Sequence, residues 1–355
     1  MSKRGTRMLG VVGFAAIIGF AAGALAQDLK KTHIKTIGSA TYLYQYKAAE
    51  LPFWGKTIPE KSGGMVTAEL LPYDTVGLKG NEILRLLKIG AFEFANGGLI
   101  IVARDDPALE GADLAGTVLT ADTLRKTLDA YRPVIERVMR EKWNSKLLLL
   151  GPNPPQVFWC NKKISGVADF KGLKIRVFGT TLADFVKGAG ATAVTMPSSQ
   201  VVQAMQRNLI DCAVTGTSNG NSAKWPEVTS HLYPAYAGWA PQFWAANLDA
   251  WNRLDPKVQA FLTEQLKDLE KEIWRIGTLG AEQGVNCSVG QGECTMPGLK
   301  KYKMTLVPIS KKDEAAIRDI VSNHVVPAWA KRCGKACVEE WNRTIGAVIG
   351  VKAPM

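Results

Sequence analysis

The sequence is poor in the residues and signatures that most catalytic sites require. It has only three histidines, His33, His231 and His324, which lie far apart along the chain. It contains no H-E-x-x-H zinc motif, no G-x-S-x-G nucleophile elbow and no Walker A phosphate loop. Gly188 and Gly190 lack the rest of a dinucleotide-binding fingerprint and more simply mark a helix end. These absences predict a protein that is not an enzyme and holds no cofactor.

Long basic or apolar runs are missing from most of the chain. Lysine and arginine outnumber aspartate and glutamate by 44 to 32, which gives a net charge of +12, but no basic run exceeds two residues. No basic stripe alternates with aromatic residues, so we expect no nucleic-acid partner. A basic balance suits an acidic small-molecule ligand better. After residue 27, no apolar segment is long enough to span a bilayer.

The first 26 residues have the three parts of a secretory signal. Lys3, Arg4 and Arg7 precede an apolar run over residues 8–25, and Ala24-Leu25-Ala26 is a small-residue cleavage site. We expect cleavage after Ala26 and export of the remaining chain. The alternative is an uncleaved N-terminal anchor.

The six cysteines favour disulfides, because an even number in a secreted chain suits an oxidising compartment. Cys287 and Cys294 would close a short loop rich in glycine and serine, and Cys333 and Cys337 would bracket Gly334. We expect both pairs to form disulfides.

Cys160 and Cys212 stand in two segments with the pattern of buried strands. They either pair with each other or remain two buried free thiols, and the sequence leaves both possibilities open. Zinc is a rival explanation for the closely spaced pairs. However, six and three residues separate the members of those two pairs, which does not match the usual two-residue spacing.

Apolar residues alternate or recur with helical spacing in an order that predicts an α/β fold. Helices over residues 42–61 and 124–138 are expected to break or kink at Pro52 and Pro133. The predicted strands cover residues 33–37, 66–71, 92–95, 146–150, 156–161, 173–177, 192–196 and 209–215.

Two features predict that the chain forms two lobes with a ligand cleft between them. Residues 151–155 (GPNPP) form the clearest linker. Asp255-Pro256 starts a helix whose apolar residues continue at intervals of three and four for about 30 residues, long enough to span both lobes. The expected organisation is a signal peptide over 1–26, a first lobe over 27–151, a second over 152–242, and segments over 243–355 that return to both.

Arg176 is the best candidate for a ligand-binding charge. It stands near the C-terminal end of the predicted strand 173–177, and such strand ends open into the crevice where α/β sheets bind ligands. A guanidinium there offers a planar fork of donors that fits a carboxylate. The alternative is an ordinary exposed charge on a strand.

Two loops are candidate linings of the cleft. Residues 215–220 (TGTSNG) follow a buried strand and carry small hydrogen-bonding groups, so they are either a binding loop or a simple connection. Residues 238–244 (GWAPQFW) place Gln242 among aromatics beside a glycine and a proline, which is typical of a loop that lines a cleft. Trp225 and Trp251 are more simply explained by packing.

Residues 169–176 (DFKGLKIR) resemble the D-L-K-G-L-K-I-R core of the solute-binding proteins of tripartite ATP-independent periplasmic (TRAP) transporters. Residues 190–200, which end in MPSSQ, are similar to the family's G-A-x-x-x-x-x-P-x-x-E segment, and residues 206–211 (QRNLID) to its Q-x-G-x-x-D-G turn. In the first lobe, residues 71–77, 82–84 and 88–90 resemble the helix and strand that follow the family's second β-strand. The resemblance covers most of the predicted mature chain in order.

The resemblance implies a periplasmic receptor of two α/β lobes that closes on an organic acid, with Arg176 holding the ligand carboxylate. One branch of the family, which binds α-keto acids, also uses a glutamine near the strand that here carries Trp159, and a Gly-Trp loop. Gln156 and Trp239 match these positions. The metal-binding branch has a glutamate just after Gly-Trp, where this chain has residues 240–242 (APQ), so we expect no metal.

Other departures from the family pattern lie at Gln200, Cys212 and Thr215, which replace a glutamate, a glycine and a ligand-binding asparagine. They argue against a keto acid. Aromatic residues such as Tyr42, Phe178, Trp239 and Phe243 suit a larger or more apolar acid. The predicted ligand-binding residues are Arg176, Gln156, Phe178, Thr215, Ser218, Trp239, Tyr42 and Asn96.

The resulting hypothesis is a solute-binding protein that delivers a carboxylate-containing solute to the membrane permease subunits of a TRAP transporter. The alternatives are a sensory protein that docks on a signalling receptor, and a secreted enzyme on the same scaffold. Homodimers occur in this family, and the sequence does not decide whether this chain forms one.

Overall fold

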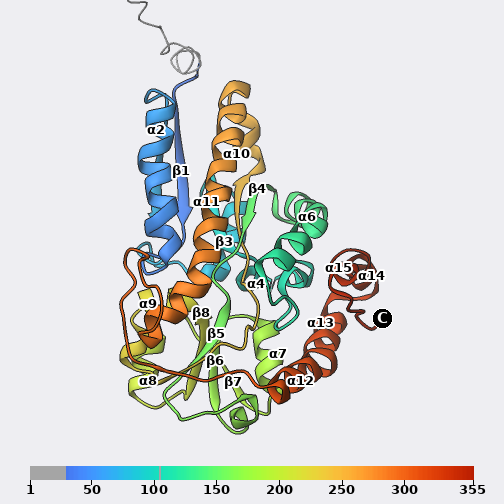
Figure 1. The fold of residues 1–355 in the computed structure, drawn as a ribbon. Coiled ribbons are helices and arrows are strands. Elements are labelled where there is room, and N and C mark those ends of the chain that lie inside the picture. Colours follow the sequence, from blue (N-terminus) through green and yellow to red (C-terminus); the bar gives the residue numbers. More distant parts are fainter. Residues whose placement is uncertain (1–28, 104) are drawn as a thin grey trace, which may run out of the picture.

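The computed structural model describes residues 29–103 and 105–355, and the predicted leader over residues 1–26 lies outside this part of the chain. Two separate sheets organise the fold, with helices packed around each. Figure 1 shows one sheet above the other, with the C-terminal helices running along one side of both. The prediction of a two-lobed α/β fold is confirmed.

The first sheet has the strand order β2-β1-β3-β10-β4. β1 pairs in parallel with β2 and β3, and β10 lies antiparallel between β3 and β4. The chain segments after β1 and β2 start at the same edge of the sheet, because these two parallel strands are in register up to their last residues. The bounds are β1 (Thr32–Gly38), β2 (Val66–Pro72), β3 (Phe94–Gly98), β4 (Ser145–Gly151) and β10 (Gln242–Asn247).

The second sheet has the order β11-β9-β5-β8-β6-β7. β6 pairs in parallel with β7 and β8, whereas β5 runs antiparallel to β8 and β9. The bounds are β5 (Gln156–Cys160), β6 (Lys174–Val177), β7 (Thr192–Thr195), β8 (Cys212–Gly216), β9 (His231–Tyr233) and β11 (Thr305–Leu306).

Helices connect the strands and cover the sheets. Their bounds are α2 (Ile58–Lys61), α3 (Ile83–Lys88), α4 (Leu99–Val102), α5 (Pro107–Glu110), α6 (Ala121–Trp143), α7 (Thr180–Gly188), α8 (Val201–Gln206), α9 (Thr217–Ser222), α10 (Leu248–Arg253), α11 (Pro256–Val289), α12 (Lys311–Ile320), α13 (Val326–Cys333), α14 (Lys335–Arg343) and α15 (Ile345–Ile349).

The long helix predicted after Asp255 is present as α11, which has 34 residues. The Asp255 side chain accepts a hydrogen bond from the N–H of Lys257, and Gly290 ends the helix in the left-handed conformation. α11 packs on β4 of the first sheet and on α9 of the second half, and Figure 1 shows it running from one sheet to the other. Neither α11 nor any other helix in the described ranges is long and apolar enough to cross a membrane.

The predicted break at Pro52 is wrong, and the helix also continues through Pro133, where a break or a kink was predicted. Residues 44–61 are helical throughout, and π-helical turns lie on both sides of Pro52. In these turns the N–H groups bond to carbonyls five residues earlier, and the wider turn accommodates the proline ring. Pro133 lies inside α6, where buried Leu128, Tyr131 and Ile135 hold the helix against the core on both sides of it.

The prediction of a cleft-lining loop over residues 238–244 is wrong from Gln242 onward. Gln242 begins β10, and all six residues of this strand are buried. A strand covered on both faces has no polar–apolar alternation, so its pattern differs little from that of an apolar loop.

Three disulfides join the cysteines. The predicted pairs Cys287–Cys294 and Cys333–Cys337 are both present. The open question about Cys160 and Cys212 resolves as a disulfide between β5 and β8, where the two residues lie directly opposite each other.

Candidate functional site

Arg176 lies on β6, between the neighbouring strands β7 and β8. Its position near the end of a buried parallel strand agrees with the sequence prediction. The whole residue is 2% exposed, so it is not an ordinary surface charge. It is also the only buried lysine or arginine in residues 29–103 and 105–355. Burying a charged side chain costs free energy, so a buried arginine indicates a functional role.

The contacts of the guanidinium leave its charge uncompensated. Nε donates to the carbonyl oxygen of Met196 (2.9 Å) and Nη1 to that of Val214 (2.8 Å). No ion pair with a carboxylate forms within the described part of the chain. Burial lowers the pKa of Arg176 to about 10, so the side chain stays protonated at neutral pH.

Aromatic side chains from both halves of the molecule lie near this cation. The Arg176 Cζ atom lies 5.1 Å from the ring centre of Phe178 and 5.7 Å from that of Trp225. Tyr42 and Tyr73 interact electrostatically with the guanidinium, and their hydroxyl oxygens are 3.3 Å apart. The arrangement is a buried charged donor with aromatic rings beside it, which suits an anion with an apolar or planar body.

The sequence analysis did not include Tyr73 and assigned Trp225 to packing. A signal for Tyr73 was available, because it follows β2 directly and Tyr42 follows β1. Parallel neighbours end at the same edge of a sheet, so residues just after both strands lie close together. Trp225 follows β8 and α9 along the chain, and no local sequence pattern marks it as a neighbour of Arg176.

The two halves touch each other around Arg176. The Ser222 hydroxyl of α9 donates to the Tyr42 carbonyl oxygen (3.0 Å). The Ala115 N–H donates to the Thr181 hydroxyl at the start of α7 (2.8 Å). These contacts place the first-half segments after β1 and α5 directly against the second half.

Four other predicted residues lie where the chain crosses between the sheets or close to these crossings. Asn96 donates to the side chain of Gln242 (2.7 Å), and Gln156 donates through its amide to the Pro154 carbonyl (2.7 Å). Trp239 is buried in the segment between β9 and β10, through which the chain returns from the second sheet to the first. This segment is the return crossover. Thr215 follows the Arg176 acceptor Val214, and its own carbonyl accepts from Trp159 (3.4 Å). Among the described residues, no hydrogen bond joins any of these four side chains to Arg176.

Ser218 faces the long helix rather than Arg176. It packs against Gly280 of α11, and its buried hydroxyl has no hydrogen-bond partner in the described part of the chain. With Gln45, whose Oε1 also lacks a partner there, it lines a cavity of about 10 Å³. That is close to the space one water needs, so this spot fits a buried water between the halves better than an organic solute.

Asp113 holds the return crossover in place. Its Oδ2 accepts the N–H groups of Trp239 (2.8 Å) and Ala240 (2.7 Å). Gly238 has a φ of +108°, and a Cβ there would lie 2.5 Å from this carboxylate, so only glycine fits. Burial raises the pKa of Asp113 to about 7, although the two backbone donors oppose the shift.

Asp113→Asn should weaken the pH dependence of stability. A pKa raised to about 7 in the folded state means that the native protein binds more protons than the unfolded chain between about pH 4 and 7. The free energy of unfolding therefore falls as pH rises through this window. Glu50, whose pKa burial also raises to about 7, contributes with the same sign.

Asparagine keeps an acceptor oxygen for both N–H groups but does not titrate. We expect the loss in melting temperature between pH 5 and pH 8 to shrink in Asp113→Asn. Asp113→Ala should lower the melting temperature at every pH, because two buried donors lose their acceptor. An unchanged slope in Asp113→Asn would contradict this account.

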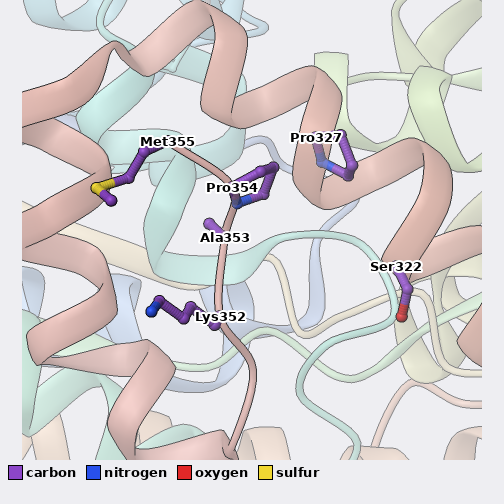
Figure 2. A pocket seen from close by; sticks show the side chains of 6 residues that line it. All are labelled: Ser322, Pro327, Lys352, Ala353, Pro354 and Met355. Carbon is purple, nitrogen blue, oxygen red and sulfur yellow. The ribbon is translucent and has the colours of Figure 1, made fainter.

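None of these residues lines the surface cavity of about 440 Å³ that Figure 2 shows. Its lining comes entirely from the C-terminal segment, which carries none of the predicted ligand-binding residues. We therefore do not take it as the solute site. The lining residues are Ser322, Pro327, Lys352, Ala353, Pro354 and Met355.

Comparison with known proteins finds one matching family and several similar proteins. The profile of the bacterial extracellular solute-binding protein family 7 matches residues 40–326. The sialic acid-binding periplasmic protein SiaP of Vibrio cholerae is 24% identical over 310 residues, which cover 82% of this chain and 90% of SiaP.

Solved structures share the fold. DctP6, a Bordetella pertussis extracytoplasmic solute receptor that binds pyroglutamic acid, is 21% identical with a TM-score of 0.77, covering 89% of this chain and 99% of its own. A TRAP periplasmic solute-binding protein from Haemophilus influenzae with bound L-gulonate is 20% identical with a TM-score of 0.77, covering 90% and 100%.

Proposed function

The chain belongs to the bacterial extracellular solute-binding protein family 7, and from this premise we propose that it is the solute receptor of a TRAP-type transporter. In this role it captures a carboxylate-containing organic solute in the periplasm and delivers it to membrane permease subunits. The family consists of solute receptors, and we propose that this chain acts as a receptor rather than as an enzyme.

The single observation that carries the proposal is the buried, uncompensated guanidinium of Arg176. A cation that is 2% exposed and has only neutral carbonyl partners within the described ranges is poised for an anion. A ligand carboxylate would accept from the donors that Met196 and Val214 leave free, and charge-assisted bonds of this kind are the strong ones. Tyr42 and Tyr73 would add hydroxyl donors from the opposite half.

The two halves already touch near Arg176, so the lobes would have to open to admit the solute and close again around it. We assign residues 27–151 to the first lobe and 152–241 to the second, since Gln242 already begins β10 of the first sheet, with residues 242–355 returning to both. The lobes are joined by the crossovers β4 to β5 and β9 to β10 and by α11. Two-lobed binding proteins close around ligands by hinge motion at a few such connections. In the closed form Phe178, Trp225 and the two tyrosines would exclude water from the bound carboxylate.

The location follows from the same assignment. We propose that the leader over residues 1–26 exports the protein and that the receptor works in the periplasm. We propose the permease partner because the chain belongs to this family and because TRAP solute-binding proteins share its fold.

A ligand screen tests the proposed function directly. The secreted protein would be heated with each member of a library of organic acids and with the corresponding amides. A ligand at a hundredfold excess over its dissociation constant stabilises the folded state by roughly 2.7 kcal/mol, which is readily seen as a shift in melting temperature. We expect shifts with acids and none with their neutral amides. Equal shifts with acids and amides would argue against a carboxylate receptor.

A further inference from the structure

We infer that Arg332 fastens the two halves of the receptor to each other and thereby controls how readily the lobes open. Its side chain joins Glu110 of the first half to Asp184 of the second. The inference rests on the proposed function and deepens it, because a solute can enter or leave a two-lobed receptor only while the lobes are apart.

One arginine contacts two carboxylates that come from opposite halves. Nη2 of Arg332 lies 3.0 Å from Oε2 of Glu110, the last residue of α5, and 2.8 Å from Oδ2 of Asp184 on α7. The side chains of Glu110 and Asp184 are 1% and 12% exposed, and that of Arg332 is 30% exposed. Solvent screens such a cluster much less than it screens a surface ion pair, so the loss of one partner has a measurable cost.

The two acids would repel each other without the arginine. Burial raises the pKa of both carboxyl groups, and Arg332 opposes the shift in each. The charge of Asp184 raises the pKa of Glu110 further, which is the sign of like charges at close range. Arg332 therefore converts a repulsive contact between the halves into an attractive one.

Arg332 itself is anchored to the first half. Trp329, one turn earlier on α13, donates from its Nε1 to the carbonyl oxygen of Pro107 at the start of α5 (2.8 Å). This contact holds α13 against the helix that ends in Glu110. When the lobes separate, the pair of Arg332 with Glu110 can stay intact, whereas the pair with Asp184 has to break.

The helix before α13 is fixed to the other half. Asp313 of α12 accepts the N–H of Val167 in the second half (2.9 Å). The π-helical turn Val321–Val325 lies between α12 and α13. Helices bend at such turns, so the two anchors can move relative to each other.

α7 connects the ion cluster to the solute site. It begins just after β6, the strand that carries Arg176. A Cβ on Gly179, between β6 and α7, would lie 2.6 Å from Ile100 of the first half. The N–H of Ala115 in the first half donates to the hydroxyl of Thr181 on α7 (2.8 Å). The start of α7 is thus pressed against the first half, and opening at the ion cluster would also part the halves beside the solute strand.

Hydrogen exchange of one amide reports this contact between the halves. The acceptor of the Ala115 N–H, Thr181, lies in the other half, so the amide loses its bond when the lobes separate. The Leu109 N–H donates to the carbonyl of Asp106 within the first half (3.1 Å) and serves as the internal reference. Exchange would be measured on the protein without residues 1–26 and without added solute.

The decisive variant is Asp184→Asn, because it removes the charge in the second half and keeps the pair of Arg332 with Glu110. We expect the Ala115 amide to exchange at least about fivefold faster in this variant, which is the size of effect that the loss of a partly buried ion pair produces. The Leu109 amide should exchange at an unchanged rate, since the first half keeps its structure.

Two further variants test the role of the arginine. Arg332→Met should accelerate exchange at Ala115 more than Asp184→Asn does, because the two acids then repel. Adding Asp184→Asn to Arg332→Met should slow this exchange again, because it removes the repulsion. Lys331→Met removes an exposed charge from the same helix and should change neither amide.

An unchanged exchange rate at Ala115 in Asp184→Asn would overturn the inference. Equal acceleration at Ala115 and Leu109 would overturn it as well, because it would indicate a loss of local structure rather than an opening of the lobes. The measurement uses no solute, so its outcome is separate from that of the ligand screen. A protein that shows the expected exchange but binds no acid would keep the lobe contact of Arg332 and lose the proposed receptor function.

Discussion

Replacing Arg176 by methionine should abolish most solute binding while leaving the fold intact. Removing one partner of a desolvated charge pair costs about 2–5 kcal/mol, so the dissociation constant should rise between about 30-fold and several-thousand-fold. The ligand-free protein should not lose much stability. The substitution frees two carbonyl oxygens, those of Met196 and Val214, but it also removes a buried charge that had no counter-ion.

Two further variants sharpen this prediction. Arg207→Ala removes an exposed arginine from the same half and should leave affinity unchanged. Arg176→Lys keeps the charge but not the planar fork and should give an intermediate affinity. If Arg176→Met binds the solute as tightly as the unmodified protein, the guanidinium does not hold the carboxylate.

The second large effect is expected at the contact between α9 and the long helix. A Cβ added to Gly284 of α11 would overlap the backbone of Thr217 and Ser218, and backbone atoms cannot turn away as a flexible side chain can. Gly284→Ala should therefore destabilise the protein by about 1–3 kcal/mol or more, as overpacking in a tight core does. Chemical denaturation would measure the change.

Gly55 provides a matched control for this substitution. It lies in the helix over residues 44–61, and a Cβ there would meet nothing within 4 Å. Gly55→Ala should be neutral or stabilise the protein by up to about 1 kcal/mol, since alanine loses less backbone entropy in a helix. Equal effects of the two substitutions would show that the close approach of α9 to α11 is not tight.

Much of the fold was predictable because its elements have strong local signals. β6 alternates apolar and basic residues, and α11 has an N-cap, a proline in its first turn and a long apolar period. β10 lacked such a signal, because both of its faces are covered and its pairing with β3 and β4 joins segments about 90 to 150 residues apart. The helices continue through Pro52 and Pro133 because tertiary packing and wide helical turns outweigh the tendency of proline to end a helix.

The site was predictable only in part for a related reason. The position of Arg176 near the end of a buried strand was predictable, because a strand end is a local feature. Tyr73 and Trp225 reach it through the register of β1 with β2 and through the path of the chain after α9, and these are properties of the folded molecule. Ser218 has a small polar side chain of the kind that often binds ligands, yet it faces α11. The orientation of α9 decides which of its small polar side chains point inward, and this orientation is not a local property of the sequence.

The most direct test of the account is the crystal structure of the protein without residues 1–26, bound to the tightest-binding acid from the screen. We expect the lobes closed on the solute, with one carboxylate held by Arg176 at charge-assisted hydrogen-bond distances of about 2.7–2.9 Å and covered by Tyr42 and Tyr73. A solute whose carboxylate lies elsewhere, with Arg176 still bonded only to the Met196 and Val214 carbonyls, would contradict the central claim.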